Sequence, residues 1–212
     1  MSRIVCTRVA CLRLPWFPID VLHQADRVAK GSPIALIRGQ GSHAQTCLVD
    51  PAARVLGLTP GMSPSRARAL VANVQLIPWD ASADALLQDA TESLTRALEQ
   101  LTPRHTLVAP GRWWLEPATP RRSASSNLQA REEAFAQRVL TCTEAQGFPG
   151  ARVAIADGPV AAEAGTRVGG SAVRWIAPGT SFPRPAGPRN KESGPSPRVP
   201  TCELRGTQGC VP

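Results

Sequence analysis

The segment Asp50–Leu70, DPAARVLGLTPGMSPSRARAL, contains the signals for two short helices joined by a tight turn. Asp50 is a good N-cap residue and Pro51 a good first helical residue, so a helix is predicted to begin here. Thr59–Met62 predicts the turn, because proline fixes one backbone torsion and glycine supplies the unusual one. Ser63 is then expected to cap the second helix. A helical hairpin with several arginines is therefore predicted.

Two interpretations of the arginines in this hairpin remain open. Arg54, Arg66 and Arg68 could together hold a phosphate-bearing partner, since guanidinium groups pair well with phosphate oxygens. They could also form the solvated face of a surface hairpin. Local sequence alone favours the second interpretation.

The rest of the chain alternates between apolar runs with strand character and amphipathic segments with helical spacing. Strands are expected at 4–14, 32–39, 44–50, 74–79, 105–110, 111–117, 151–157 and 171–179, and helices at 18–29, 82–101, 130–147 and 158–167. Ser82 is the expected cap of the longest helix. Because the strands and helices do not follow a regular βαβ spacing, the pattern predicts an α+β domain.

The composition favours a basic protein of a reducing compartment. The 212 residues carry a formal net charge of +8, and all basic residues except Lys30 and Lys191 are arginines. Such a balance favours a polyanionic partner without choosing between kinds of polyanion. The six cysteines form no CxxC pair, and no apolar run is long enough to span a membrane. A cytoplasmic protein without a metal or other cofactor, and without membrane association, is expected.

The sequence changes character near residue 180. The segment 180–212 holds seven of the 21 prolines and shows no hydrophobic period, so it is expected to be disordered. The folded part is expected to cover residues 4–178.

Six segments, in this order along the chain, resemble the palm and fingers of the Y-family (translesion) DNA polymerases. They are ACLRLPWFPIDVLHQAD (10–26), SPIALIRG (32–39), the hairpin 50–70, VQLIPWD (74–80), GRWWLEP (111–117) and ARVAIADGPVAAEAGTR (151–167). Within the family, the resemblance is greatest to the ImuB type, the polymerase-like member of a bacterial mutagenesis cassette. It implies an α+β fold, with a mixed palm sheet covered by helices and a small fingers subdomain.

The same resemblance implies that the catalytic carboxylates are missing. Nucleotidyl transfer uses two metal ions, and Mg²⁺ requires several converging carboxylate oxygens. The family places an Asp-x-Asp-like pattern at the end of the first strand and an Asp-Glu pair in a central hairpin. Those positions are Leu14 and Trp16, and Gly111 and Arg112, in this sequence. No catalytic residue and no metal ligand is therefore expected.

Three other carboxylates could substitute for the missing ones. Asp20 follows the first strand, Glu116 lies beyond the central hairpin and Asp157 ends a later strand. A residual metal-dependent nucleotidyltransferase that uses them is the alternative hypothesis. Each of the three is more often a surface or ion-paired residue.

The resemblance leaves only part of the nucleotide-binding set. The family places a Tyr and an Arg in the fingers. Those positions are Pro51 and Arg54 in this sequence, so Arg54 is the one candidate for phosphate binding. Two late lysines become Pro159 and Glu163, and the residue that screens the sugar becomes Ile19. Tight nucleotide binding is not expected.

Trp113 and Trp114 are candidates for stacking on bases, or for packing in the core. Neighbouring strand residues point to opposite faces, so at least one of the two is expected to be structural.

These features predict a non-catalytic, ImuB-like protein of DNA repair, translesion synthesis and damage-induced mutagenesis. It is expected to act as a scaffold or as a weak, non-specific DNA-binding module. Its expected partners are DNA, an active translesion polymerase and other proteins of the mutagenesis cassette. The family's thumb and further DNA-gripping domain are not recognisable in the sequence, so a non-functional, truncated gene product is a further alternative.

Overall fold

The computed structural model describes residues 8–29, 31–117 and 128–180, which belong to a single structural unit. The predicted disordered tail, 180–212, lies outside the described residues except for Thr180. The α+β fold class predicted from the sequence is confirmed.

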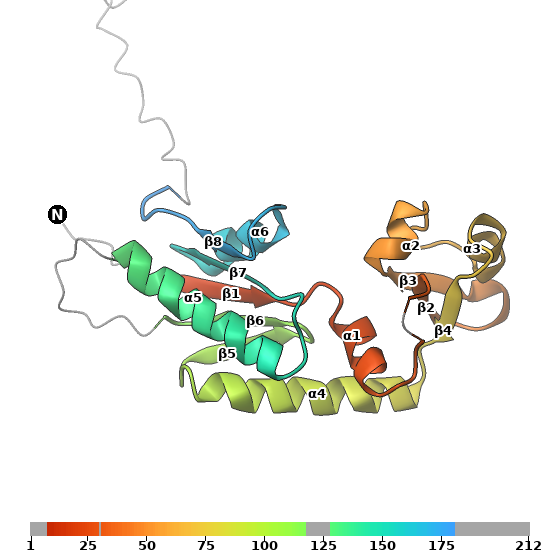
Figure 1. The fold of residues 1–212 in the computed structure, drawn as a ribbon, viewed down its shortest axis with the longest axis horizontal. Helices are drawn as coiled ribbons and strands as arrows, with labels where there is room; N and C mark the ends of the chain where they lie inside the picture. The colour runs from red at the N-terminus through yellow and green to blue at the C-terminus, as the bar shows by residue number, and fades with distance from the viewer. Residues whose placement is uncertain (1–7, 30, 118–127, 181–212) are drawn as a thin grey trace, which may run out of the picture. The chain divides into compact units, whose positions relative to one another are not determined.

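A five-stranded mixed sheet forms the larger layer of the fold (Figure 1). Its strands, in the order β5-β6-β1-β7-β8, are β5 His105–Ala109, β6 Arg112–Leu115, β1 Val9–Arg13, β7 Arg152–Ala156 and β8 Val173–Trp175. Only the β7–β8 pair is parallel. β1 is the central strand, and its three middle residues, Ala10, Cys11 and Leu12, are all buried because helices cover both faces of the sheet there.

Two long helices, α4 (Ala81–Glu99) and α5 (Leu128–Ala145), cover one face of this sheet (Figure 1). They pack because their apolar stripes meet the inward-pointing residues of β1, β6 and β7. The shared core is fully or almost fully buried and includes Leu12, Leu94, Leu98, Trp113, Phe135, Val139, Val153 and Ile155. This cluster is the main core of the described residues.

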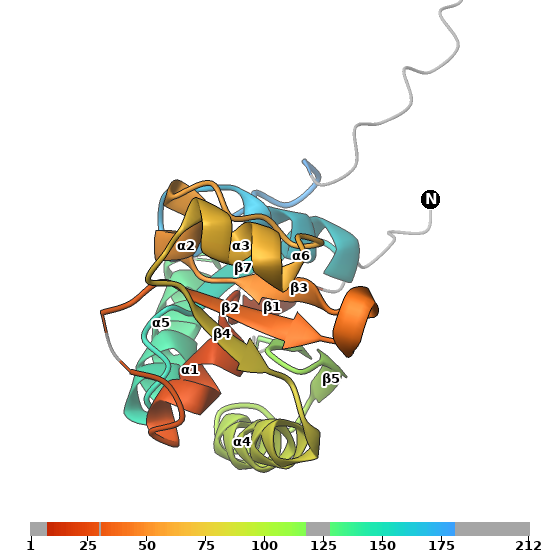
Figure 2. The same ribbon diagram turned by 90° about the vertical axis from the view of Figure 1, so that its right-hand side faces the viewer.

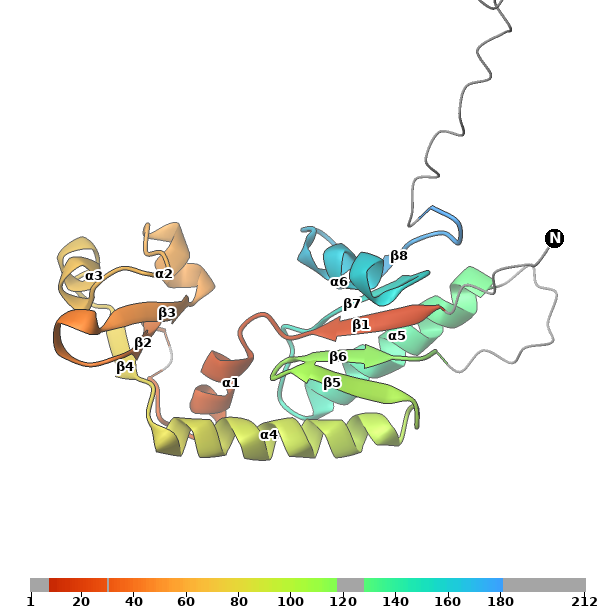
Figure 3. The ribbon, with the colours of Figure 1, turned by 180° about the vertical axis from the view of Figure 1, so that it is seen from behind.

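The opposite face is covered by one short helix, α6 (Pro159–Arg167), which contacts β1 and β7. Small side chains allow the close approach: a Cβ added to Gly165 would lie 2.8 Å from the Cβ of Ala154. Figure 3 shows the sheet from this side, with β1, β5 and β6 in front of α5. The part of this face over β5 and β6 carries no described helix.

A second, three-stranded sheet has the order β3-β2-β4 (Figure 2). Its strands are β2 Ile34–Arg38, β3 Gln45–Val49 and β4 Gln75–Pro78, and α2 (Pro51–Val55) and α3 (Pro64–Leu70) complete this subdomain. A short 3₁₀ helix, Gly41–His43, joins β2 to β3. Helix α1 (Phe17–Gln24) adds Ile19 and Leu22 to a core shared with β2.

The capping predictions were right for the hairpin and wrong for the longest helix. The backbone N–H of Ala53 donates to Asp50 over 2.7 Å, and that of Arg66 to Ser63 over 3.3 Å. In α4 the cap is Asp80, which accepts from Ala83 N over 2.8 Å, and not Ser82. Asp and Ser are comparable caps, so the position of the first turn decides between them.

Within the described residues, no helix has the length and apolar character needed to cross a membrane.

Candidate functional site

The end of β1 meets the β5–β6 turn, where the resemblance places metal-binding carboxylates. Leu14 N donates to Gly111 O over 2.8 Å, and the Leu14 side chain is 4% exposed within the main core. Gly111 has a φ of +80°, and an added Cβ would lie 2.8 Å from the Phe17 Cβ and 3.0 Å from Leu14 O. The backbone here is therefore shaped for glycine, with no room for a side chain at residue 111.

Arg112, the next residue, forms an ion pair with Glu163 of α6. Its Nη1 lies 2.5 Å from the Glu163 carboxylate, and Arg167 Nη2 reaches the same oxygen over 2.6 Å. Burial alone would raise the pKa of Glu163, but the hydrogen bond from Arg167 and the positive charge of Arg112 lower it. The two residues that replace a carboxylate and a lysine of the family pattern thus form a charge-reversed pair.

Arg54, the predicted phosphate-binding residue, contacts the palm side of the molecule. Its guanidinium carbon lies 4.7 Å from the centroid of the Trp16 ring, a cation–π contact. Asp50 fixes the helix that carries Arg54, because it caps α2. The structure therefore brings together Arg54 and Trp16, two positions that the family pattern assigns to nucleotide and metal binding. Arg54 itself remains solvent-exposed.

The three carboxylates that could have replaced the missing ligands do not converge. Glu116 pairs with Arg104 over 3.0 Å, and Asp157 accepts from Arg8 over 2.9 Å. The Asp20 carboxylate makes no hydrogen bond or ion pair with a described residue, and its partial burial raises its pKa to about 6. Among the residues described, no group of three or more His, Cys, Asp or Glu is arranged to hold a metal ion.

Asp157 belongs to a buried ionic network that the sequence did not reveal. Arg8 donates to Glu132 over 2.7 Å as well as to Asp157, and also to Ile176 O over 2.8 Å. Trp175 Nε1 donates to the same Glu132 carboxylate over 2.7 Å. Glu132 is fully buried, and these donors compensate its charge. No local signal predicts the network, because its members are far apart in sequence.

The adjacent tryptophans take different roles, as the alternation of strand residues predicts. Trp113 is fully buried, packs edge-to-face on Phe17 and donates to Thr95 Oγ1 over 3.0 Å. Trp114 lies on the α6 side of the sheet, and its buried Nε1 has no partner among the described residues. Trp113 is therefore structural, and Trp114 is the one left for contact with a ligand.

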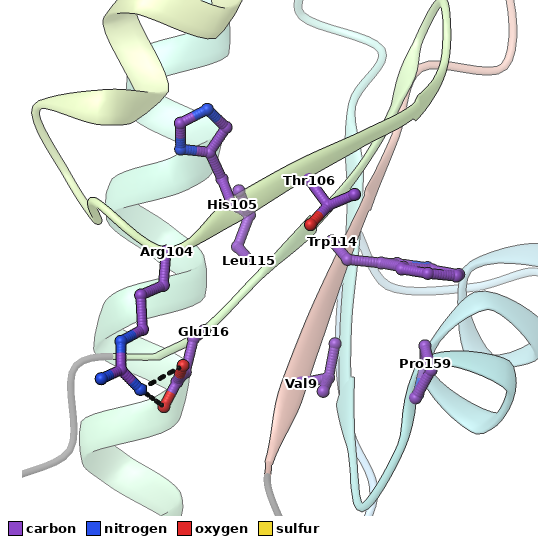
Figure 4. A pocket seen from close by; sticks show the side chains of 8 residues that line it. All are labelled: Val9, Arg104, His105, Thr106, Trp114, Leu115, Glu116 and Pro159. Atoms are coloured by element: carbon purple, nitrogen blue, oxygen red, sulfur yellow. Dashed lines mark hydrogen bonds and ion pairs between the residues drawn. The ribbon is translucent and has the colours of Figure 1, made fainter.

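Trp114 lines a shallow cavity of about 260 Å³, another feature that the sequence did not predict (Figure 4). The Arg104–Glu116 pair lies at one side of this cavity, and Val9 and Pro159 lie at the other. Its lining is mainly apolar.

No protein-family model and no curated protein sequence matches the chain. Solved structures do match the chain. DinB from Sulfolobus solfataricus has a TM-score of 0.63 at 13% identity, and covers 82% of this chain and 49% of its own. A post-insertion binary complex of Dbh DNA polymerase has a TM-score of 0.66 at 15% identity, with coverages of 80% and 48%.

A Y-family DNA polymerase chimera of Dbh and Dpo4 gives a TM-score of 0.63 at 12% identity, with coverages of 82% and 49%. The chain thus spans about half the length of the solved polymerases it matches. At such identities the likeness concerns the fold. The described residues have the α+β palm-and-fingers fold of the Y-family DNA polymerases.

Proposed function

We propose that this chain is a non-catalytic, ImuB-like relative of the Y-family polymerases that serves DNA repair and damage tolerance. It binds DNA weakly and without sequence preference, and acts as a scaffold beside an active translesion polymerase and other mutagenesis-cassette proteins in the cytoplasm. The observation that carries the proposal is the junction of Leu14 and Gly111. Apolar packing and a glycine-only backbone occupy the place where the fold's relatives are expected to converge carboxylates.

The charge distribution supports DNA as the partner. The chain has a net charge of +8, and arginines of the larger sheet and of α6 lie beside the replaced metal positions. Arg54 extends this positive surface from α2 and remains exposed. Binding through such contacts depends on phosphate neutralisation and is salt-dependent.

Fluorescence anisotropy of a labelled primer–template tests the DNA-binding part. We expect saturable binding at low salt that weakens about tenfold or more between 50 and 200 mM salt. Arg54→Ala should weaken binding further, whereas Arg138→Ala, on the far side of the sheet, should change it little. A folded protein that binds no primer–template at tens of micromolar would contradict the proposal and favour an inactive gene product.

Primer extension with Mg²⁺ or Mn²⁺ tests the non-catalytic part. The competing hypothesis, a residual nucleotidyltransferase that uses Asp20, Glu116 or Asp157, predicts metal-dependent extension that is lost in Asp20→Ala. We expect no extension by the wild-type chain. Extension that survives purification and depends on Asp20 would refute the scaffold proposal.

A further inference from the structure

Three arginines lie in one row across the three central strands of the larger sheet, at one end of those strands. Arg13 of β1 lies directly opposite Arg112 of β6 on one side and Arg152 of β7 on the other. Directly opposed residues of antiparallel strands project their side chains on the same face, and neighbouring strands are about 4.8 Å apart. We call Arg112, Arg13 and Arg152 the arginine ladder; its three side chains leave the sheet within about 10 Å.

The ladder projects on the face that α6 covers only in part. Cys11, two residues before Arg13 and on the same face, packs against Ala162 of α6. α6 also brings Arg167 and Glu163 to this end of the face. The ladder therefore lies at the end of β1, next to the Leu14–Gly111 junction.

The positive charge at this place greatly exceeds its compensation. Glu163 is the one described carboxylate paired with the ladder or with Arg167, so four arginines share one negative charge. The thiol of Cys11 adds none, because burial raises its pKa to about 12. Burial lowers the pKa of Arg13, and the positive charge of Arg167 lowers it further.

The ladder also has unused hydrogen-bond donors. The guanidinium groups of Arg13 and Arg152 make no hydrogen bond or ion pair with any described residue, whereas their backbones belong to the sheet. The Nε of Arg112 is buried and has no partner within the described part of the chain. Unpaired buried donors and opposed like charges both cost free energy, so the fold alone gives no reason to keep this row.

We propose that the arginine ladder is a binding site for a diphosphate or longer oligophosphate group, held without a divalent cation. Guanidinium groups present paired N–H donors that match phosphate oxygens, and several of them neutralise a multiply charged anion. The unpaired donors of Arg13 and Arg152 and the Nε of Arg112 are the groups available to it. A divalent cation would meet arginines here instead of oxygen ligands, so the anion must bind to the protein directly.

Isothermal titration calorimetry with inorganic pyrophosphate, in EDTA and at about 50 mM salt, tests the site. We expect saturable binding that Arg13→Ala weakens at least tenfold, because the variant loses hydrogen bonds between a charged donor and a charged acceptor. The matched control is Arg96→Ala, which removes the same charge from α4 on the other face of the sheet. No binding, equal affinity in both variants, or binding only with added Mg²⁺ would overturn the proposal.

Thermal unfolding shows whether weaker binding by Arg13→Ala results from a folding defect. Without ligand, Arg13→Ala should unfold at the wild-type midpoint or above it, because one like charge is gone. Pyrophosphate should raise the midpoint of the wild type and of Arg96→Ala by more than that of Arg13→Ala. An equal rise in all three proteins would count against the ladder.

Competition identifies the source of the phosphate. A nucleoside triphosphate that displaces pyrophosphate indicates a nucleotide, whereas displacement by a 5′-phosphorylated oligonucleotide, and not by its 5′-hydroxyl form, indicates a strand end. Neither competition experiment depends on the proposed scaffold function. Loss of primer–template binding with intact pyrophosphate binding would reject the proposed function alone, and the reverse would reject the ladder alone.

Discussion

The arginines at the two ends of β1 have opposite electrostatic surroundings. Arg8, just before the strand, is surrounded by the carboxylates of Glu132 and Asp157 and by a backbone carbonyl, and its side chain is 10% exposed. Arg13, at the other end, has two arginines as strand neighbours and no ion pair with a described residue. One strand thus carries a satisfied ionic network and an uncompensated cluster five residues apart.

The comparison distinguishes an arginine whose charge the fold compensates from one whose charge it leaves uncompensated. A buried ion is tolerated when its partners and hydrogen bonds are complete, as they are around Glu132. Arg8 and its partners join β1, α5 and β8 at the end of the sheet far from α1. The uncompensated end is the one where the Y-family pattern places its metal ligands, and the anion proposed above would supply the missing negative charge there.

Removing Arg8 should have the largest effect. Arg8→Ala leaves Glu132 buried without its ionic partner, and we expect the free energy of unfolding to fall by about 3–5 kcal/mol. Urea denaturation followed by circular dichroism measures this. Arg104→Ala breaks the exposed pair with Glu116 and should cost no more than about 1 kcal/mol. Equal losses in the two variants would remove the contrast between the ends of the strand.

A carboxylate at residue 111 tests whether the backbone beside the other end of β1 can accept a side chain. Gly111→Asp places a Cβ against Phe17 and Leu14 O on a backbone with a φ of +80°, so we expect a loss of about 2–4 kcal/mol. Gly61→Asp is the matched control, because Gly61 has a φ of +89° and nothing within 4 Å of an added Cβ. Its loss, from backbone strain alone, should be about 1 kcal/mol.

Gly111→Asp should also fail to restore primer extension. A single carboxylate next to Arg112 and the buried Leu14 provides no oxygen set for two metal ions. Metal-dependent extension by this variant would show that the site is one substitution away from catalysis.

Most elements of the fold were predictable because their signals are local. The strand at Val9–Arg13 and the caps Asp50 and Ser63 each follow from a few neighbouring residues. Even the α4 error was local, since Asp80 and Ser82 are both good caps two residues apart.

The site was predictable only where the family pattern supplied the positions. Arg112 and Glu163 were both assigned in this way, but nothing in the sequence showed that they pair with each other across 51 residues. The ladder depends on the register of β1 with two strands that follow it by about a hundred residues or more. Registers and long-range ion pairs arise from packing, which no local window contains.

Asp20 gives a pH-dependent test of the uncompensated end. It follows that end in the sequence, yet partial burial raises its pKa to about 6, whereas pairing with the arginines would have lowered it. A carboxyl with a higher pKa in the folded state binds its proton more tightly there. The contribution of Asp20 to the free energy of unfolding is therefore largest below about pH 4 and decreases as the pH rises through about 6.

Asp20→Asn should remove this pH dependence. We expect the variant to be more stable than the wild type by about 1 kcal/mol at pH 7.5, a value discounted for partial exposure, and to match it near pH 4. Asp89→Asn, which removes the same charge from the exposed surface of α4, is the matched control. A variant that is destabilised at pH 7.5 would mean that the Asp20 carboxylate has a cationic partner and compensates the arginines after all.

Arg13→Ala should have the smallest effect and the opposite sign from Arg8→Ala. Removing the middle arginine relieves repulsion with Arg112 and Arg152, so the free energy of unfolding should rise by about 0.2–1 kcal/mol at low salt. The gain should shrink as salt approaches 1 M, because screening already weakens the repulsion in the wild type. Urea denaturation at two salt concentrations measures both effects. A loss of stability that is independent of salt would place Arg13 among the structural arginines, with Arg8, and the two ends of β1 would no longer differ in kind.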